Sequence, residues 1–414
     1  MINLGCARNL VDSQIILGRL KKNGHPIVDA QCADVAIVNT CSFIAEAKAE
    51  SVDMILDLIE LKKQGKIRKL VVAGCLAQRY AHELVDELKG VDAYVGALAL
   101  EKAKFYPQVS LTPKHFAYLK ICESCFNQCS FCAIPKIKGK FSSRTIESVI
   151  EEVKFLDQRG VKEINIVGQD ITAYGMDIYR KKSLARLLRE IVSVAKNVRW
   201  VRLLYAFPAH MDAELIDVIA NEKKICRYID MPLQHISDRV LKDMNRSITK
   251  QETLDLVGLI RKKIPEASLR TTFIVGFPGE TDAEFNELVD FIKASRFERA
   301  GVFVYSKEEE TPAHDLPYHV TESVKKKRLD ILMKTQREIS RDVQNKFMGK
   351  TIDVLIDEKQ KGEDHVYLGR SEYDAPDVDG LVYVHSKRAL NPGDFVSVEI
   401  TDTYEYDLAG ELVA

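Results

Sequence analysis

Short apolar runs alternate with amphipathic segments over the first hundred residues, as strands and helices do in a parallel α/β sheet. The runs predict strands at residues 2–4, 35–39 and 70–73, with helices at 11–22 and 43–63 between them. A cysteine stands two positions after each predicted strand. These cysteines are Cys6, Cys41 and Cys75.

A polar connector, residues 107–115, precedes a second series of alternating elements. Its predicted strands are 116–121, 163–167, 201–204, 227–231, 269–274 and 300–304, and its predicted helices are 146–159, 184–195, 212–220, 238–244 and 284–294. Six such βα units predict a partial barrel, in which the loops after the strands line the site. Gln169, Gly276 and Glu280 follow strands and are candidates for holding a cofactor, although a glycine at such a turn also serves simple turn geometry.

A basic helical segment, about residues 321–347, leads into a region where apolar positions alternate with a period of two. Strands are predicted there at 352–356, 366–369, 380–384, 395–400 and 404–408, which favours a small closed β-barrel. The fold class is therefore α/β with a C-terminal barrel. The predicted domains are 1–106, 114–345 and 346–414.

Composition supports a large globular enzyme, since 46% of the 414 residues are hydrophobic. No apolar run approaches the ~20 residues that span a bilayer, and the N-terminus lacks a basic segment followed by an apolar one. The nine cysteines are an odd number in metal-like spacings, which indicates a reducing compartment. We expect a cytoplasmic protein without a membrane partner.

The predicted C-terminal barrel is acidic. From Lys346 to Ala414 there are seven Lys or Arg and fifteen Asp or Glu, a net charge of −8, which leaves about +7 for the rest of the chain. Barrels that bind RNA carry a basic surface. The charge therefore favours a basic partner over RNA.

Cys125, Cys129 and Cys132 stand at C-x3-C-x2-C spacing, one short of the four ligands of an ordinary cubane iron–sulfur cluster. A cluster held by three cysteines leaves one iron open, where S-adenosylmethionine can chelate and accept an electron. The spacing therefore indicates radical chemistry. The alternative is a zinc knuckle that also uses Cys122, but zinc ribbons space their cysteine pairs further apart.

Cys6, Cys41 and Cys75 each follow a strand of one predicted parallel sheet, and the carboxyl ends of such strands meet at one edge. The repeated placement predicts a second three-cysteine cluster. The alternative is that these cysteines fill strand ends as small buried apolar residues.

The cysteine motif, with Phe131 before its last cysteine, resembles the radical S-adenosylmethionine superfamily. Over nearly its whole length the chain resembles the methylthiotransferase family, and within it the RimO type. The matching segments are residues 4–13 (LGCARNLVDS), 39–44 (NTCSFI), 74–80 (GCLAQRY), 369–371 (GRS) and 374–380 (DAPDVDG).

The resemblance implies an N-terminal cluster domain, a radical S-adenosylmethionine barrel and a C-terminal TRAM domain. It implies two 4Fe-4S clusters, on the two cysteine sets, with no catalytic side chain beyond their ligands. One molecule of S-adenosylmethionine would donate a methyl group and another would be cleaved reductively. The implied reaction is methylthiolation of the β-carbon of an aspartate in the small-subunit ribosomal protein numbered twelve, with a reductant such as flavodoxin or ferredoxin.

Three other functions fit parts of the pattern, one of them a radical enzyme that lacks a second cluster and does not insert sulfur. The MiaB type modifies an isopentenylated adenosine in transfer RNA, but its first motif usually has Gln-Met-Asn after the cysteine, where this chain has Ala7, Arg8 and Asn9. Another alternative is a ribosome-binding or iron–sulfur carrier protein whose clusters are structural or regulatory. A structural cluster gains nothing from the open iron that an incomplete cysteine set leaves. The chain departs from the family at Gln14, usually Glu, and at Glu310, usually Gly.

Overall fold

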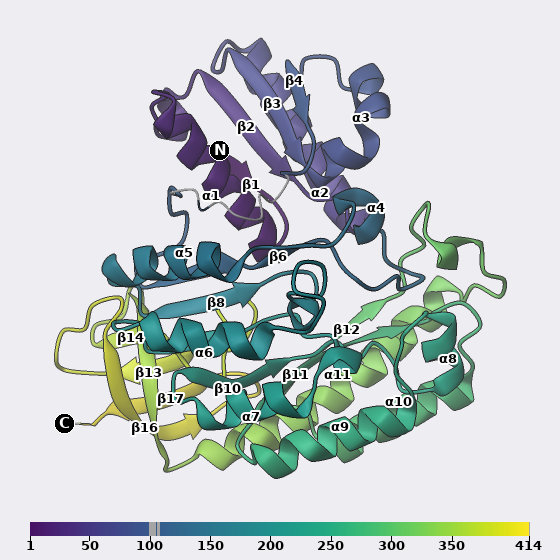
Figure 1. Ribbon diagram of the computed structural model, residues 1–414, viewed down its shortest axis with the longest axis vertical. Helices are drawn as coiled ribbons and strands as arrows, with labels where there is room; N and C mark the ends of the chain where they lie inside the picture. Colours follow the sequence, from purple (N-terminus) through teal and green to yellow (C-terminus); the bar gives the residue numbers. More distant parts are fainter. Residues whose placement is uncertain (99–104, 106–107, 414) are drawn as a thin grey trace.

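The computed structural model describes residues 1–98, 105 and 108–413, which form three parts (Figure 1). The predicted domain end at 106, the start of the connector at 107 and the last residue, 414, lie outside the described residues. None of the described helices is both long and apolar enough to cross a membrane.

The N-terminal part is a parallel sheet with strand order β1-β2-β3-β4, as the pattern of its first three strands predicts. Its core is formed by apolar side chains from positions 4 to 84, so this part has a core of its own. The prediction missed β4 and α3. The elements are β1 (Ile2–Asn3), α1 (Ala7–Lys22), β2 (Val35–Thr40), α2 (Ala45–Lys63), β3 (Lys69–Gly74), α3 (Cys75–Glu87) and β4 (Ala93–Val95).

The central part is an open parallel sheet with strand order β12-β11-β10-β9-β8-β5, which confirms the six-stranded partial barrel. Because the order follows the chain, β5 and β12 form its two edges. Its strands are β5 (Phe116–Lys120), β8 (Glu163–Val167), β9 (Trp200–Leu203), β10 (Ile225–Asp230), β11 (Ser268–Val275) and β12 (Arg299–Val304). A small antiparallel pair, β6 (Cys122–Glu123) and β7 (Ser142–Ser143), flanks the cysteine loop.

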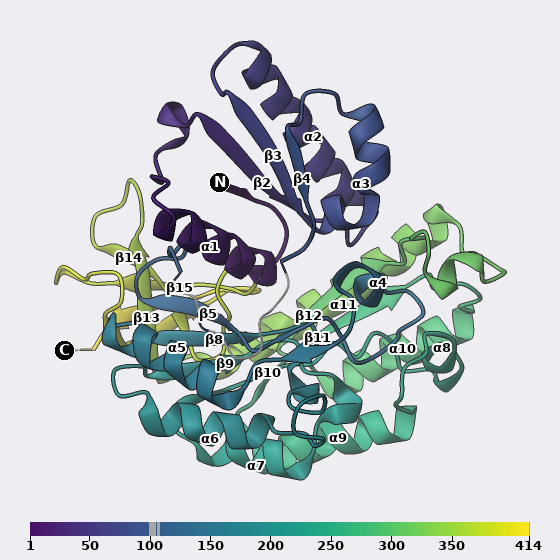
Figure 2. The ribbon, with the colours of Figure 1, turned by 45° about the horizontal axis from the view of Figure 1, so that its top comes forward.

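Helices cover the outer face of this sheet (Figure 2). They are α5 (Ile146–Gln158), α6 (Leu184–Val194), α7 (Ala213–Asn221), α8 (Asp238–Asp243), α9 (Lys250–Lys263), α10 (Asp282–Ser295) and α11 (Glu322–Gln344). The short helix α4 (Ile134–Lys138) lies instead against α3 of the N-terminal part. Helix α9 was not predicted from the sequence; it begins at a capping box formed by Thr249 and Glu252. A second capping box, of Thr281 and Glu284, starts α10 two residues before its predicted position.

The C-terminal part is a closed barrel with strand order β13-β14-β15-β17-β16. The predicted strand at 404–408 is wrong. Tyr404 N donates to Asp407 O and closes a turn there, so the last strand begins only at Leu408. The strands are β13 (Thr351–Lys359), β14 (Val366–Ser371), β15 (Val382–His385), β16 (Phe395–Thr403) and β17 (Leu408–Leu412).

The three parts share one apolar cluster inside the open barrel. Val11 and Ile15 of α1 pack there with Tyr118 and Tyr228 of the barrel strands and with Leu355 of the C-terminal barrel. Figure 2 shows α1 lying between the N-terminal sheet and the barrel strands. The first helix therefore lies over the concave face of the partial barrel and brings the end of β1 to its mouth.

Candidate functional site

The first cysteine set lies where strands of the N-terminal sheet end. Cys6 is the residue before α1, Cys41 follows β2 directly, and Cys75 begins α3. Burial, with a smaller contribution from charge on Cys41 and Cys6, raises the pKa of Cys75 to about 12 although Lys138 opposes the change. The three thiols are therefore close enough to affect one another's charge. The structure thus brings together the three cysteines predicted to meet.

Asn9 holds the strand ends around this set. Its Nδ2 donates to Leu4 O and Thr40 O, both at 3.0 Å, and Cys75 Sγ donates to its Oδ1 at 3.8 Å. One buried amide therefore ties the ends of β1 and β2 to the first residue of α3. Asn9 lies within the motif of residues 4–13, but its contacts join segments far apart in the chain and could not be predicted from the sequence.

The second cysteine set lies in the loop between β6 and α4. Cys132 N donates to Cys129 O at 3.1 Å, which folds the loop back on itself. Burial raises the pKa of Cys125 to about 11, with the Asp170 charge next in importance. It also raises the pKa of Cys132 to about 12, and charge on Cys129 and Cys125 adds to this effect.

N–H groups point at a sulfur in each set. In the first set, Arg8 Nε donates to Cys6 Sγ at 3.3 Å. In the second set, Asn127 Nδ2 lies 3.6 Å from Cys125 Sγ, and Arg246 Nη1 lies 3.7 Å from Cys129 Sγ. Such donors stabilise electron-rich sulfur and tune a bound cluster. Arg246 lies far from the motif in sequence, and no local signal marks it.

Arg8 also connects the two sets. Burial acts to raise the pKa of Cys6, but the Arg8 charge and hydrogen bond outweigh it, so this pKa is lowered. The same guanidinium lies over the ring of Tyr205 at 4.5 Å and lowers the pKa of Cys132 against the effect of burial. One partly buried cation therefore acts on a thiol of each set.

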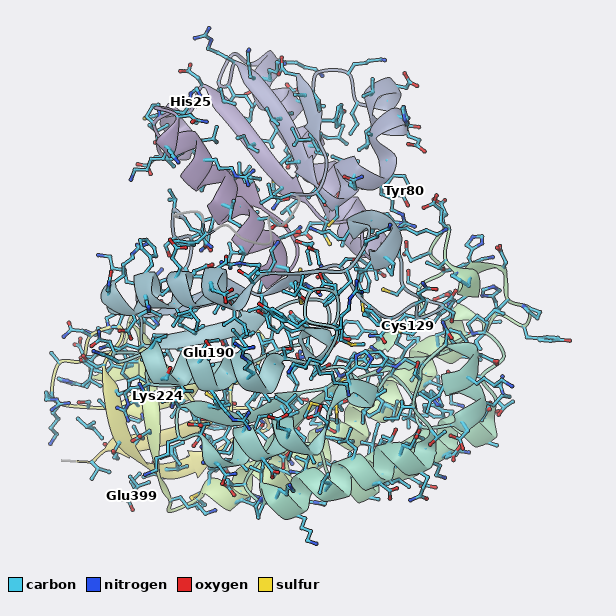
Figure 3. The ribbon with its side chains drawn as sticks, viewed as in Figure 1. His25, Tyr80, Cys129, Glu190, Lys224 and Glu399 are labelled. Carbon is cyan, nitrogen blue, oxygen red and sulfur yellow. The ribbon has the colours of Figure 1, made fainter. Side chains whose placement is uncertain are left out.

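The two sets also touch through packing, because Cys75 lies against Ala133, the residue after Cys132. Figure 3 shows Cys129 in the barrel below the N-terminal domain, with Tyr80 of that domain above it on the same side of the molecule. The six predicted cysteines thus lie along one interface between the N-terminal sheet and the barrel.

Among residues 1–98, 105 and 108–413, no three His, Cys, Asp or Glu side chains are grouped as the ligands of a metal ion would be. A cubane cluster separates its sulfur ligands more widely than one ion does. Two sets of three thiols with N–H donors on their sulfurs match the ligand chemistry of such clusters. The residues present therefore fit two iron–sulfur clusters.

The three predicted cofactor residues make contacts within the protein. Gln169 Nε2 donates to Glu123 Oε1 at 2.9 Å. Glu280 Oε2 accepts from Gly276 N at 2.5 Å and from Phe277 N at 3.1 Å, and Glu280 Oε1 lies 3.2 Å from Arg328 Nη1. Gly276 has φ 73°, and a Cβ there would lie 2.3 Å from a side-chain carbon of Lys325, so packing alone requires glycine. That these residues hold a cofactor stays a prediction.

His235, which follows β10, is fully buried. Burial lowers its pKa to about 3, and its Nδ1 accepts from Ser237 N at 3.0 Å. The ring therefore stays neutral near pH 7, and its Nδ1 is engaged in a hydrogen bond within the protein.

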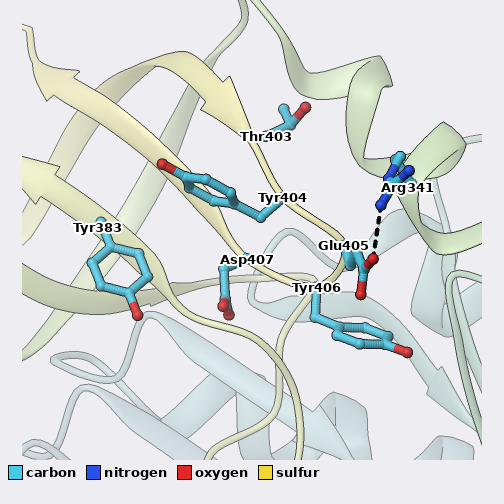
Figure 4. A pocket seen from close by; sticks show the side chains of 7 residues that line it. All are labelled: Arg341, Tyr383, Thr403, Tyr404, Glu405, Tyr406 and Asp407. Atoms are coloured by element: carbon cyan, nitrogen blue, oxygen red, sulfur yellow. Dashed lines mark hydrogen bonds and ion pairs between the residues drawn. The ribbon is translucent and has the colours of Figure 1, made fainter. Parts of the chain in front are cut away.

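A pocket of about 700 Å³ lies where α11 meets the C-terminal barrel (Figure 4). Tyr383, Tyr404 and Tyr406 surround it, and Asp407 points into it from the turn that replaces the predicted strand. The remaining lining residues are Arg341, Thr403 and Glu405. Aromatic rings beside a carboxylate suit a guanidinium or ammonium group.

Models of three protein families match the three parts of the chain. "Uncharacterized protein family UPF0004" matches residues 1–96, the radical SAM superfamily matches 119–292, and the TRAM domain matches 348–413.

The chain is also similar over its full length to curated proteins. It is 46% identical to ribosomal protein uS12 methylthiotransferase RimO of Clostridioides difficile, covering 99% of this chain and 98% of that one. It is also 46% identical to the protein of the same name from Aquifex aeolicus, covering 99% and 96%. Among solved structures, the radical S-adenosylmethionine methyltransferase TsrM of Kitasatospora setae matches with TM-score 0.53 and 16% identity, covering 77% of this chain and 68% of that one. This last likeness concerns the fold alone.

Proposed function

Because this chain belongs to the RimO family of radical S-adenosylmethionine methylthiotransferases, we propose that it transfers a methylthio group to the β-carbon of an aspartate in ribosomal protein uS12. Full-length relatives named for this reaction favour it over modification of transfer RNA. The enzyme uses two 4Fe-4S clusters and S-adenosylmethionine.

The observation that carries the proposal is the meeting of two incomplete cysteine sets at one interface, with Arg8 acting on both. Cys125, Cys129 and Cys132 would hold the cluster that cleaves S-adenosylmethionine. Cys6, Cys41 and Cys75 would hold the second. When bound, the first cluster supplies an electron for radical formation and the second supplies a site for the sulfur to be transferred.

The side chains around the sulfurs orient the ligands and exclude water. Asp170 Oδ2 accepts from Asn127 Nδ2 at 2.8 Å and lies 2.8 Å from His210 Nδ1, which fixes the amide that faces Cys125. Arg246 Nη2 donates to Pro232 O at 2.6 Å, which fixes the guanidinium near Cys129. Each donor is therefore held by a further contact, as metal-site partners commonly are.

The net charge of the C-terminal barrel supports one class of substrate. The C-terminal barrel region carries a net charge of −8, and the aromatic pocket at its junction with α11 suits a basic side chain. Ribosomal proteins are basic, whereas acidic surfaces repel RNA. A basic protein substrate is therefore the partner that the charge of this barrel supports, either free or on the ribosome.

The proposal extends to compartment and electron donor. Nine cysteines without a disulfide among the described residues fit a reducing cytoplasm. A flavodoxin or ferredoxin would supply electrons there.

The proposal is tested by anaerobic reconstitution with iron and sulfide, followed by mass spectrometry. A uS12 peptide and an isopentenylated anticodon stem of transfer RNA are offered together. We expect one methylthio group on the peptide aspartate. Modification of the RNA instead would assign the enzyme to the alternative function.

Single cysteine variants test whether the two cysteine sets perform different steps, cofactor cleavage at one and sulfur insertion at the other. We expect Cys129→Ala to abolish 5′-deoxyadenosine formation, and Cys41→Ala to retain part of it while stopping sulfur insertion. Cys32→Ala is the matched control, because Cys32 is exposed and belongs to neither set. Loss of both activities in Cys41→Ala, with the fold intact, would contradict the proposed roles.

A further inference from the structure

Two groups of charged side chains join the N-terminal domain to the barrel. One lies at β5 and the other just after β12, which are the two edges of the open barrel sheet. Each of the three helices that follow a cysteine of the first set contributes to them. These contacts therefore fix the first cysteine set relative to the barrel at both edges.

The first group involves α1, the helix that follows Cys6. Asp12 of α1 pairs with Lys120 of β5 and lies 3.1 Å from Lys138 Nζ of α4. Glu123 accepts from the same two lysines, at 2.6 and 3.5 Å. All four side chains are at most 5% exposed, and their formal charges sum to zero.

The second group involves the helices that follow Cys41 and Cys75. Lys48 Nζ of α2 lies 2.8 Å from Glu308 Oε2, and Arg79 Nη1 of α3 lies 3.3 Å from the same oxygen. Arg79 also donates to Ser42 O at 3.1 Å and to Glu309 O at 2.6 Å. A single barrel carboxylate therefore receives two cations of the N-terminal domain, one from each helix.

Glu308 is held in place by its own loop. Its Oε1 accepts from Ser306 Oγ at 2.7 Å, and its carbonyl accepts from Thr311 Oγ1 at 2.7 Å. The side chain is 2% exposed. The Glu308 carboxylate is therefore held in a fixed position on the barrel, unlike a mobile charged side chain at the surface.

We propose that Asp12, Lys48, Arg79 and Glu308 are positioning residues that set the first cysteine set opposite the second one. Ion pairs are directional, so pairs at both edges of the barrel sheet fix the rotation of the N-terminal domain as well as its distance from the barrel. Apolar packing alone does not fix that rotation. The proposal rests on the proposed function, because sulfur must be delivered to a carbon activated at the other site. A misplacement of about 1 Å at such a site reduces rate by about 100-fold.

The test compares Glu308→Gln with Glu309→Gln in the full-length enzyme loaded with both clusters. Glu309 is the matched control, since it is adjacent, equally charged and exposed, and its carboxylate has only a 3.4 Å contact with Tyr80 Oη. The first measurement is the ratio of 5′-deoxyadenosine formed to peptide methylthiolated. We expect Glu308→Gln to raise this ratio about 10-fold or more, and Glu309→Gln to leave it unchanged.

A second measurement does not depend on turnover. Pulsed electron paramagnetic resonance on the two reduced clusters reports the distribution of distances between them. We expect a broader distribution in Glu308→Gln than in Glu309→Gln. Lys48→Met, at a side chain that is 24% exposed, removes one of the two cations with less risk to folding and should show the same change in both measurements.

An unchanged ratio with an unchanged distance distribution in both Glu308→Gln and Lys48→Met would overturn the proposal. A proportional loss of deoxyadenosine and product would also overturn it, because it indicates general damage. If the wild-type enzyme left the uS12 peptide unmodified, the proposed function would fail, while the distance measurement would still decide whether these residues position the clusters.

Discussion

Glu310 adopts a backbone angle that glycine adopts without strain. Its φ is 62°, in the left-handed region where glycine is free of strain and other residues are not. The resemblance to the methylthiotransferase family implies Gly at this position, and the geometry of the loop gives a physical reason for that residue. The loop keeps its shape here because Glu308 and Thr311, on either side, are held by hydrogen bonds.

Glu280 should make stability depend on pH. Burial raises its pKa from 4.5 to about 7, although Arg328 and two backbone N–H groups oppose the change. The folded protein thus binds the proton more tightly than the unfolded chain does, and stability falls as pH rises from about 4.5 through 7. The loss is on the order of 2–3 kcal/mol.

The variant Glu280→Gln isolates this effect, because an amide oxygen can still accept from Gly276 N and Phe277 N but has no proton to lose. Denaturant unfolding at pH 5, 6, 7 and 8 should show the wild type losing stability relative to the variant as pH rises. Parallel curves for the two proteins would contradict the assignment.

At the scale of elements, hydrophobic periodicity predicted the barrel strands and the strand ends that carry Cys6, Cys41 and Cys75, because buried parallel strands are short apolar runs. It misplaced the last strand, since Tyr404 and Tyr406 have high β propensity but lie in a turn closed by Asp407. It could not place Arg246 beside Cys129 either. That contact joins residues 117 positions apart and depends on how the barrel closes.

Arg370 of β14 should be critical for docking of the C-terminal barrel. Its guanidinium binds both oxygens of Asp357, at 2.8 and 2.9 Å, and Glu163 Oε2 of β8 at 2.5 Å. Arg370→Met leaves Glu163 with Arg202 as its other cation, and removing one partner of a buried ion pair costs about 3–5 kcal/mol. We expect the first thermal unfolding transition to occur at a lower temperature, and the backbone amides of β13 and β14 to exchange hydrogen faster.

The control for this variant is Arg388→Met, because Arg388 is exposed in the same barrel and makes no ion pair with the described residues. It should leave both measurements unchanged. Equal behaviour of the two variants would show that the buried pair does not hold the barrel in place.

At the scale of the whole molecule, charge is unevenly distributed. The net charge is −1, yet the region from Lys346 to Ala414 carries −8. Its exposed carboxylates include Glu399, Asp402 and Glu411. Such a distribution favours encounter with a basic partner through one end of the molecule.

Neutralising these three carboxylates, with Glu399→Gln, Asp402→Asn and Glu411→Gln together, should slow binding of uS12 and flatten its dependence on salt, because steering by charge is screened by ions. Stopped-flow association at two salt concentrations measures both. The control neutralises Glu147, Glu151 and Asp290, which are exposed on α5 and α10. Equal slowing in both proteins would exclude a specific role for the C-terminal barrel.

The contacts that join the N-terminal domain to the barrel also determine when, during synthesis, the two can dock. The buried residues of the N-terminal core all lie between positions 4 and 84, whereas the pair of Lys48 and Glu308 spans 260 positions. During synthesis the N-terminal domain can therefore fold long before its docking partner leaves the ribosome. Until the segment that carries Ala133 is made, Cys75 lacks the residue that packs against it in the complete fold, so the first cysteine set is more accessible to iron and sulfide at that stage.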